Sequence, residues 1–307
     1  MTAIVVAENL GRWYGQVAGL NEVSLSIAGG ITGLVGINGA GKSTLIKLLV
    51  GEIRPSRGSI RVLGREPFAN RSYFRKIGFC PQQDALYDEL TGFGLVTFLL
   101  RLSGFSRSQA RRSAKETLQR VGMADAMHRR IGGYSKGMRQ RVKIAQAIAH
   151  QPELLICDEP LNGLDSVGRR DILELLTELG DSGVHVLVSS HVLHEIENLT
   201  ENIVLLHRGR VLAQGSVPEV RRLLTRFPRR VEIKAGHARQ CAEAIMPLEH
   251  VLSVGIIPET GVVKIETRDI DQFYRDLTAI VAAGELEIGS LEAVDAGLEA
   301  IFDYLVD

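Results

Sequence analysis

Short apolar runs alternate with helical patterns along the first part of the chain. The runs at 31–36, 153–157 and 184–190 are rich in Val, Ile and Leu and are bounded by turn-type residues. Such runs are typical of strands buried inside a sheet. The segment 43–51 instead has helical spacing, and Gly51 is placed to end that helix. This alternation predicts an α/β fold in which helices cross over a sheet.

The pattern becomes purely helical between residues 91 and 150. The apolar positions Met138, Val142, Ala145 and Ala149 recur at helical spacing and predict one continuous buried face. We therefore expect a helical subdomain, at about 84–150, inserted into the α/β core of a first domain that covers residues 1–225.

A second, smaller domain is expected from residue 228 to 307, after the interruption "TRFPRR". Three strand-like runs are followed by two helical stripes, which predicts an α+β accessory domain. The first stripe consists of Phe273, Leu277, Ile280 and Val281, and the second of Leu291, Val294, Leu298, Ile301, Phe302 and Leu305. We interpret both stripes as core, with a face that docks a partner as the alternative.

Composition narrows the class of protein. Across 307 residues, 36 Lys and Arg balance 36 Asp and Glu, so no global field favours nucleic acid as a partner. The cysteines Cys80, Cys157 and Cys241 lack metal-type spacing and indicate a reduced compartment. We expect neither a secretory signal nor a membrane span, because no apolar run approaches the roughly 18 residues that a spanning helix needs.

The stretch "GINGAGKST", residues 36–44, carries the first chemistry. Gly36, Gly41, Lys42 and Ser43 satisfy every fixed position of the pattern G-x-x-x-x-G-K-[ST]. In such a loop the backbone N–H groups surround phosphate oxygens, and the glycines allow the close approach. We expect the loop to bind a nucleoside triphosphate, with Lys42 on the β- and γ-phosphates and Ser43 on Mg²⁺. The loop residues counted as binding positions are Gly36, Asn38, Gly39, Ala40, Gly41, Lys42, Ser43 and Thr44.

Two carboxylates follow directly after the apolar run 153–157. Asp158, at the end of the expected strand, is placed to hold Mg²⁺ through water, and Glu159 to polarise an attacking water. A merely solvated acidic loop is the alternative. The neighbouring Cys157 is expected to be an inert core thiol.

The segment "GGYSKGMRQRVKIAQAIA", residues 132–149, resembles the LSGGQ signature of ATP-binding cassette (ABC) transporter subunits. Lys136 replaces the first signature glycine, while Ser135 and Gly137 keep the hydroxyl and the close-approach position. The helix that begins here is an anion site on physical grounds. P-loop kinases and small GTPases share the phosphate loop but lack this segment.

The resemblance covers roughly residues 3–220 and implies further site residues. Tyr14 matches the aromatic residue that stacks on adenine, with Trp13 as the competing candidate. Gln82 matches the metal-sensing glutamine, while its neighbour Gln83 is interpreted as a solvated amide. Asp165 matches the aspartate of the loop that crosses to a partner subunit, and His191 matches the switch histidine. The resemblance implies a catalytic pair, Glu159 and His191, and three metal-binding residues, Ser43, Gln82 and Asp158.

The family's architecture implies the partners. A single cassette is expected to form a homodimer that clamps two ATP molecules, each with Mg²⁺, between the phosphate loop of one copy and Ser135 and Gly137 of the other. Separate integral membrane permease subunits would supply the pathway and the contacts to the cargo. The chain would then lie peripherally at the cytoplasmic face of the membrane. "YSKGMRQR" and the closing Leu-Glu-Ala pattern resemble exporters of the multidrug, sodium and copper-related subgroup, so export is the expected direction.

Two other functions stay open at this point. A soluble ATPase of the same superfamily could remodel ribosomes or DNA, but the second cassette or long coiled coil of those members is not visible. A regulatory binding module with a degenerate ATPase is supported by Lys136 alone. Complete absence of ATP hydrolysis would favour this regulatory module.

Overall fold

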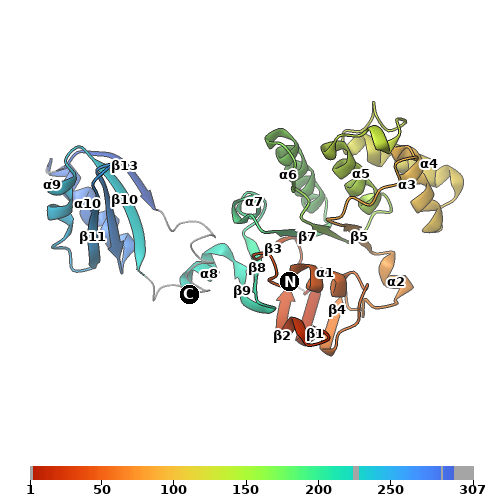
Figure 1. The fold of residues 1–307 in the computed structure, drawn as a ribbon, viewed down its shortest axis with the longest axis horizontal. Helices are drawn as coiled ribbons and strands as arrows, with labels where there is room; N and C mark the ends of the chain where they lie inside the picture. Colours follow the sequence, from red (N-terminus) through yellow and green to blue (C-terminus); the bar gives the residue numbers. More distant parts are fainter. Residues whose placement is uncertain (1–2, 224–227, 285, 294–307) are drawn as a thin grey trace. The chain divides into compact units, whose positions relative to one another are not determined.

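The computed structural model describes residues 3–223, 228–284 and 286–293 and divides the chain into two compact units (Figure 1). The first unit is Met1–Gly215 and the second is Ser216–Asp307. The division therefore falls ahead of residue 225, where the sequence pattern placed the end of the first domain. The helix α8 (Val217–Leu223) belongs to the second unit.

A six-stranded sheet forms the centre of the first unit, in the order β5-β6-β7-β3-β8-β9. Its strands are β3 (Ile31–Val35), β5 (Ile77–Cys80), β6 (Leu154–Asp158), β7 (His185–Ser190), β8 (Asn202–His207) and β9 (Arg210–Ser216). The pairs β5–β6, β6–β7, β7–β3 and β3–β8 are all parallel. Because parallel strands end at the same edge, the residues that follow β3, β6 and β7 meet there.

A separate antiparallel sheet has the order β2-β1-β4. Its strands are β1 (Val5–Tyr14), β2 (Val17–Ile27) and β4 (Arg57–Val62). The helix α1 (Lys42–Leu49) packs against β2 and β4 of this sheet and against β6 of the other. Leu45, Leu48 and Leu49 are fully buried in the shared core. This packing fixes the helix that follows the phosphate loop.

Helices form the region between β5 and β6. They are α3 (Gly92–Leu102), α4 (Arg107–Arg120), the short 3₁₀ turn η1 (Ile131–Gly133) and α5 (Lys136–Ile148). Side-chain caps start them: Thr91 caps α3, and Ser106 forms a capping box with Gln109 on α4. Val142, Ala145 and Ala149 are buried, and Met138 is half-buried. The remaining helices of the first unit are α2 (Arg71–Phe74), α6 (Ser166–Asp181) and α7 (Leu193–Glu197).

The second unit has a four-stranded antiparallel sheet in the order β11-β12-β10-β13. Its elements are β10 (Arg229–Ala235), α9 (Ala238–Ile245), β11 (Val251–Ile257), β12 (Val262–Thr267), α10 (Ile270–Ala282) and β13 (Ile288–Ala293). The succession βαββαβ with this strand order is the split βαβ arrangement of ferredoxin-like domains. Val231, Ile233, Ile265, Phe273 and Leu277 lie in its core.

Two helical expectations in this unit are wrong. Leu291, expected to start a final helix, lies in β13 opposite Ile233, where hydrogen bonding to β10 provides a partner that periodicity does not include. Val281 lies on α10 but is 38% exposed, so the core-facing stripe of α10 consists of Phe273, Leu277 and the partly buried Ile280. The other positions of the expected final stripe, Val294, Leu298, Ile301, Phe302 and Leu305, lie outside the described residues.

No helix in the described ranges combines the length and the apolar character that crossing a membrane requires.

Candidate functional site

The loop between β3 and α1 is shaped by its glycines. Gly39 and Gly41 have φ values of 81° and 108°, which side chains disfavour. A methyl group at Gly36 would lie 2.4 Å from the carbonyl oxygen of Leu206. The first glycine is therefore required by close packing and the later two by backbone conformation. Such a conformation directs backbone N–H groups toward one point, as phosphate binding needs.

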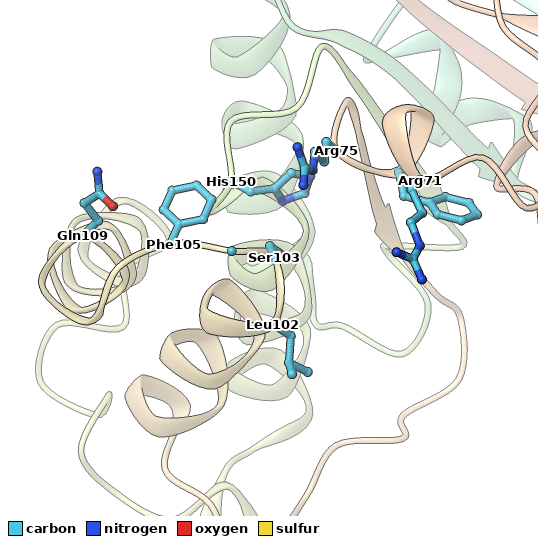
Figure 2. Close-up of a pocket in the computed structure, with 9 residues that line it drawn as sticks. Arg71, Arg75, Leu102, Ser103, Phe105, Gln109 and His150 are labelled. Atoms are coloured by element: carbon cyan, nitrogen blue, oxygen red, sulfur yellow. The ribbon is translucent and has the colours of Figure 1, made fainter.

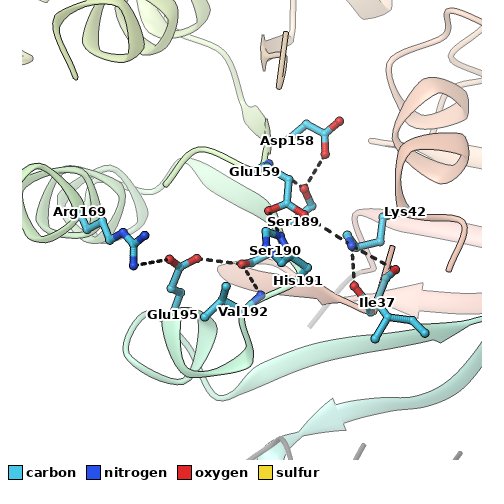
Figure 3. A network of polar contacts seen from close by, with 11 residues as sticks. Ile37, Lys42, Asp158, Glu159, Arg169, Ser189, Ser190, His191, Val192 and Glu195 are labelled. Carbon is cyan, nitrogen blue, oxygen red and sulfur yellow. Dashed lines mark hydrogen bonds and ion pairs between the residues drawn. The ribbon is translucent and has the colours of Figure 1, made fainter. Parts of the chain in front are cut away.

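Lys42 joins this loop to the end of β6 (Figure 3). Its buried ammonium donates to the carbonyl oxygens of Gly36 and Ile37, at 2.5 and 3.5 Å. It also lies 3.5 Å from Oε1 of Glu159. A buried ammonium needs such partners, because an unpaired charge away from water is costly. Lys42 is thus held over the loop and beside a carboxylate.

A cavity of about 280 Å³ lies over the loop and gathers most of the expected nucleotide-binding residues. It is lined by Tyr14, Val17, Ala18, Gly19, Ile37, Asn38, Gly39, Ala40, Gly41, Lys42, Ser43, Thr44, Gln82 and Glu159. Gly36 does not line the cavity, but its carbonyl oxygen accepts a hydrogen bond from the cavity-lining Lys42. The structure thus brings together the end of β1, the start of β2, the loop, and the segments that follow β5 and β6.

The geometry distinguishes the paired candidates at two places. Tyr14 lines the cavity and carries the guanidinium of Arg12 at 5.1 Å from its ring centre. Trp13 is half-buried and lies against the backbone, where a methyl group on Gly11 would be 2.5 Å from its ring. Gln82 lines the cavity and Gln83 does not.

Asp158 ends β6 as a buried carboxylate. Its Oδ1 accepts a hydrogen bond from the hydroxyl of Ser189 at 2.6 Å. Burial raises the pKa of Asp158 above its ordinary value, and the positive charges of Lys42 and Lys143 act in the opposite direction. An oxygen ligand of this kind, kept in place by β7, suits a hard cation.

Glu159 adopts a strained backbone conformation, with φ of 50°. Its N–H donates to Oγ of Ser189 at 2.9 Å, and its Oε2 lies 2.7 Å from Nδ1 of His191. One serine therefore holds both carboxylate residues at the carboxyl edge of the sheet. Sequence reasoning missed Ser189, although the two serines that close the run 184–190 were the available signal.

Lys143 is a second residue that sequence reasoning missed. It is only 3% exposed, and its Nζ donates to the carbonyl oxygen of Gln82 at 3.2 Å. It stands next to Val142 of the buried stripe on α5, and its charge beside that stripe was the signal. Through this bond α5 fixes the backbone of the Gln82 loop.

Three expected residues lie apart from the cavity. Ser135 caps α5 by accepting from the N–H of Met138 at 3.3 Å, and Asp165 caps α6 by accepting from the N–H of Gly168 at 2.9 Å. Gly137 is next to Leu164. None of the three lines the cavity. Asp158 and His191 do not line the cavity either, but they adjoin the cavity-lining Glu159, Asp158 through Ser189 and His191 directly. The structure therefore separates the expected residues into one gathered set and one set at two helix starts.

Lys136, which replaces the first glycine of the signature, lies beside Gly163 in the 161–165 loop. Gly163 has φ of 70°, and a methyl group there would lie 1.8 Å from Nζ of Lys136. The positive φ favours glycine at position 163, and the end of the Lys136 side chain occupies the space beside it.

Oxygen ligands for a magnesium ion are available without a dense acidic cluster. Within the described ranges, no group of three or more His, Cys, Asp and Glu side chains is arranged to hold a metal. Ser43 and Gln82 both face the cavity, and Asp158 stands one residue before the cavity-lining Glu159. Hydroxyl, amide and carboxylate oxygens fit Mg²⁺, which keeps several waters and few protein ligands.

Comparisons with known proteins agree with this geometry. A family model described as ABC transporter matches residues 20–162. The bacitracin transport ATP-binding protein BcrA of Enterococcus faecalis is 30% identical over 309 residues, covering 100% of the chain and 97% of BcrA. The linearmycin resistance ATP-binding protein LnrL of Bacillus subtilis is 32% identical, covering 96% of each.

A shorter match is closer in sequence. The uncharacterized ABC transporter ATP-binding protein YxlF of Bacillus subtilis is 40% identical over 188 residues, which span 61% of the chain and a little under two thirds, 62%, of YxlF.

Two solved structures resemble the first unit in size and fold. An ATP-binding subunit of an ABC transporter has a TM-score of 0.66 at 31% identity, covering 72% of the chain and 93% of that subunit. The dimeric bacterial ABC transporter cassette MJ0796 has a TM-score of 0.64 at 26% identity, covering 69% of the chain and 98% of the cassette.

Proposed function

The chain belongs to the ABC transporter family as an ATP-binding ATPase cassette, and we propose that it powers export through separate membrane subunits. The observation that carries the ATPase role is the single cavity that combines the phosphate loop, Lys42 and Glu159. The direction of transport is supported by relatives of nearly full length that are named for bacitracin transport and linearmycin resistance. The proposed cargo class is therefore antibiotic-like small molecules.

ATP binding follows from the lining of the cavity. Tyr14 presents an exposed ring at one end, suited to stacking on adenine, and the loop N–H groups surround the phosphates. Lys42 exchanges its carbonyl partners for phosphate oxygens, which are stronger acceptors because they are charged. We assign Ser43, Gln82 and Asp158 to hold Mg²⁺, which neutralises the phosphate charge when it is bound.

Hydrolysis is assigned to Glu159 and His191. The Glu159 carboxylate faces the cavity and can accept a proton from an attacking water. His191, 2.7 Å from Glu159, orients that carboxylate and can reach the γ-phosphate. The chemistry is positioning and electrostatic stabilisation, because phosphoryl transfer requires little covalent participation from the protein.

A second copy of the chain is required to complete the site. Ser135, Gly137 and Asp165 are positioned away from the cavity at the starts of α5 and α6. The start of α5, capped by the neutral Ser135, attracts anions, so two copies can each present it to the nucleotide on the other. We propose a homodimer with two ATP molecules, which opens when loss of the γ-phosphate removes the charge that both copies contact.

The permease is assigned to a groove between α2 and the turn from α3 to α4 (Figure 2). The groove has a volume of about 810 Å³ and is lined by Arg71, Phe74, Arg75, Leu102, Ser103, Gly104, Phe105, Gln109 and His150. Phe74 and Leu102 are 42% and 69% exposed there. Exposed apolar side chains rimmed by arginine suit a short amphipathic helix. Docking at this groove would place the chain at the cytoplasmic face of the membrane.

The test is purification of the chain from its native membrane, with identification of co-purifying membrane proteins and measurement of ATP hydrolysis. Glu159→Gln should abolish turnover and keep ATP affinity. Leu102→Asp should lose the membrane partners and keep basal hydrolysis. The control Val281→Asp, at an exposed position of the second unit, should keep both the membrane partners and basal hydrolysis. A wild-type chain that hydrolyses ATP but co-purifies with no membrane protein would favour a soluble remodelling ATPase. Wild-type turnover in Glu159→Gln would refute the assigned chemistry.

A further inference from the structure

One guanidinium connects the start of α6 to α7. Arg169, in the first turn of α6, donates from Nε to the carbonyl oxygen of Leu164 at 3.2 Å. Its Nη1 lies 3.4 Å from Oε1 of Glu195 on α7. The loop 161–165, which precedes α6, is thereby tied to the helix that follows His191 (Figure 3).

The second oxygen of Glu195 continues the connection. Glu195 Oε2 accepts from the hydroxyl of Ser190 at 2.9 Å, and the same hydroxyl oxygen accepts from the N–H of Val192 at 3.0 Å. These two bonds bracket His191 on both sides in the chain. The backbone on both sides of His191 is therefore held by Ser190, Val192 and Glu195.

His191 extends the connection into the site. Its Nδ1 lies 2.7 Å from Glu159 Oε2, and Glu159 Oε1 lies 3.5 Å from Nζ of Lys42. Polar contacts thus run from Leu164, in the 161–165 loop, through Arg169 and Glu195 to Ser190. The chain itself joins Ser190 to His191, and polar contacts continue from His191 through Glu159 to Lys42.

A stabilising role alone does not explain this arrangement. The neighbouring Arg170 forms its ion pair with Glu174 on the same helix, at 3.8 Å, and both side chains are exposed to solvent. Glu195, by contrast, is 11% exposed and shares its carboxylate between two elements. Exposed pairs contribute little to stability, whereas a nearly buried carboxylate with partners on both oxygens fixes geometry.

We propose that Arg169 and Glu195 are positioning residues that transmit the placement of the 161–165 loop to His191. The inference rests on the proposed function, in which Asp165 of this loop faces the partner copy. Docking of that copy sets the position of Leu164 and Arg169, and Glu195 and Ser190 then orient the imidazole beside Glu159. Each site thereby becomes competent only when the second copy is seated.

The kinetic test uses Arg169→Ala, Glu195→Gln and their double variant, with Arg170→Ala as the matched control. We expect kcat to fall about tenfold in each of the first two, because small misplacement of a catalytic group is costly, while KM for ATP stays within about twofold. The double variant should lose no more than either single variant, as residues in one chain of contacts do. Arg169→Lys should recover most of the loss. Wild-type kcat in Arg169→Ala, an equal loss in Arg170→Ala, or multiplicative losses would overturn the proposal.

Hydrogen exchange provides a readout that needs no activity. In the nucleotide-free full chain, Arg169→Ala should accelerate amide exchange in the segment 190–195 about threefold or more, because the Val192 amide loses its fixed acceptor. Arg170→Ala should leave that segment unchanged. Unaltered exchange in Arg169→Ala would reject the connection even in an active enzyme. If the wild-type chain hydrolysed no ATP, the proposed function would fail. The exchange measurement would still show whether Arg169 links the 161–165 loop to the segment around His191.

Discussion

Charged side chains are buried at the carboxyl edge of the parallel sheet but exposed to solvent on the four-stranded sheet of the second unit. At the edge, Lys42 and Glu159 are buried and 3.5 Å apart, beside the buried Asp158. On the second sheet, Glu232 pairs with Lys264 at 3.3 Å across β10 and β12, where both are in contact with solvent. The first arrangement concentrates charge where phosphate and a cation would bind. The second balances charge between directly opposite residues.

The difference teaches how function is recognised in this chain. Glu159 keeps a strained backbone, and Asp158 keeps a carboxylate away from water, although both features oppose stability. Nothing comparable is present in the described part of the second sheet, whose charges follow strand register. Strained backbone and a buried carboxylate at the same edge of a sheet both lower stability, so their occurrence together indicates a functional site.

The largest effect is expected from removing the buried lysine. Lys42→Ala should weaken ATP binding about 100-fold or more, because a desolvated charge that meets phosphate is lost. Fluorescent-nucleotide titration measures this. Lys264→Ala removes a lysine with a similar pairing distance from the second unit and should leave ATP affinity unchanged. If Lys42→Ala bound ATP as tightly as wild type, the buried charge at the sheet edge would have no more part in ATP binding than the exposed charge on the second sheet.

A smaller loss of affinity is expected at the aromatic end of the cavity. Tyr14→Ala should weaken ATP binding about tenfold, because stacking of a base on an aromatic ring is worth roughly 1–3 kcal/mol. Trp13→Ala should instead lower thermal stability and leave affinity within about twofold, since Trp13 does not line the cavity. A larger affinity loss in Trp13→Ala than in Tyr14→Ala would reverse the assignment.

A gain in stability is expected at Asp158. Burial raises the pKa of this carboxyl, so the folded chain binds the proton more tightly than the unfolded chain does. The ionised form is therefore destabilising, and the penalty appears as pH rises through the raised folded pKa and vanishes below the unfolded value. Without nucleotide, Asp158→Asn should raise Tm by roughly 2 °C at pH 7 and by less near pH 4. A lower Tm at pH 7 would show that Asp158 stabilises the fold.

The smallest effect is expected on the second sheet. Glu232→Ala removes one partner of the solvent-exposed pair with Lys264 and should change the free energy of unfolding by less than about 0.5 kcal/mol. Urea denaturation of the full chain, monitored by a probe in the second unit, measures this. A loss of several kcal/mol would mean that this sheet also depends on specific charge contacts.

The parts of this molecule that sequence could predict are those set by local pattern. The glycine loop, the strand that ends in Asp158 and the start of α5 at Ser135 follow from spacing and residue type. Local pattern marks Ser189 and Lys143 as unusual but does not give their partners, nor the partners of Glu195. Each acts on a residue at least five positions away that only the sheet order or helix packing brings near. For the same reason Leu291 was assigned to a helix, since its partner strand β10 lies far away in sequence.

The central claim, that two copies clamp ATP between the phosphate loop and the Ser135 helix, is tested most directly by the mass of Glu159→Gln in solution. With ATP and Mg²⁺, light scattering should give twice the chain mass of 33.6 kDa. Adding Ser135→Arg should return the mass to that of a single chain while ATP stays bound. A Glu159→Gln chain that is saturated with ATP and remains at 33.6 kDa would contradict the account.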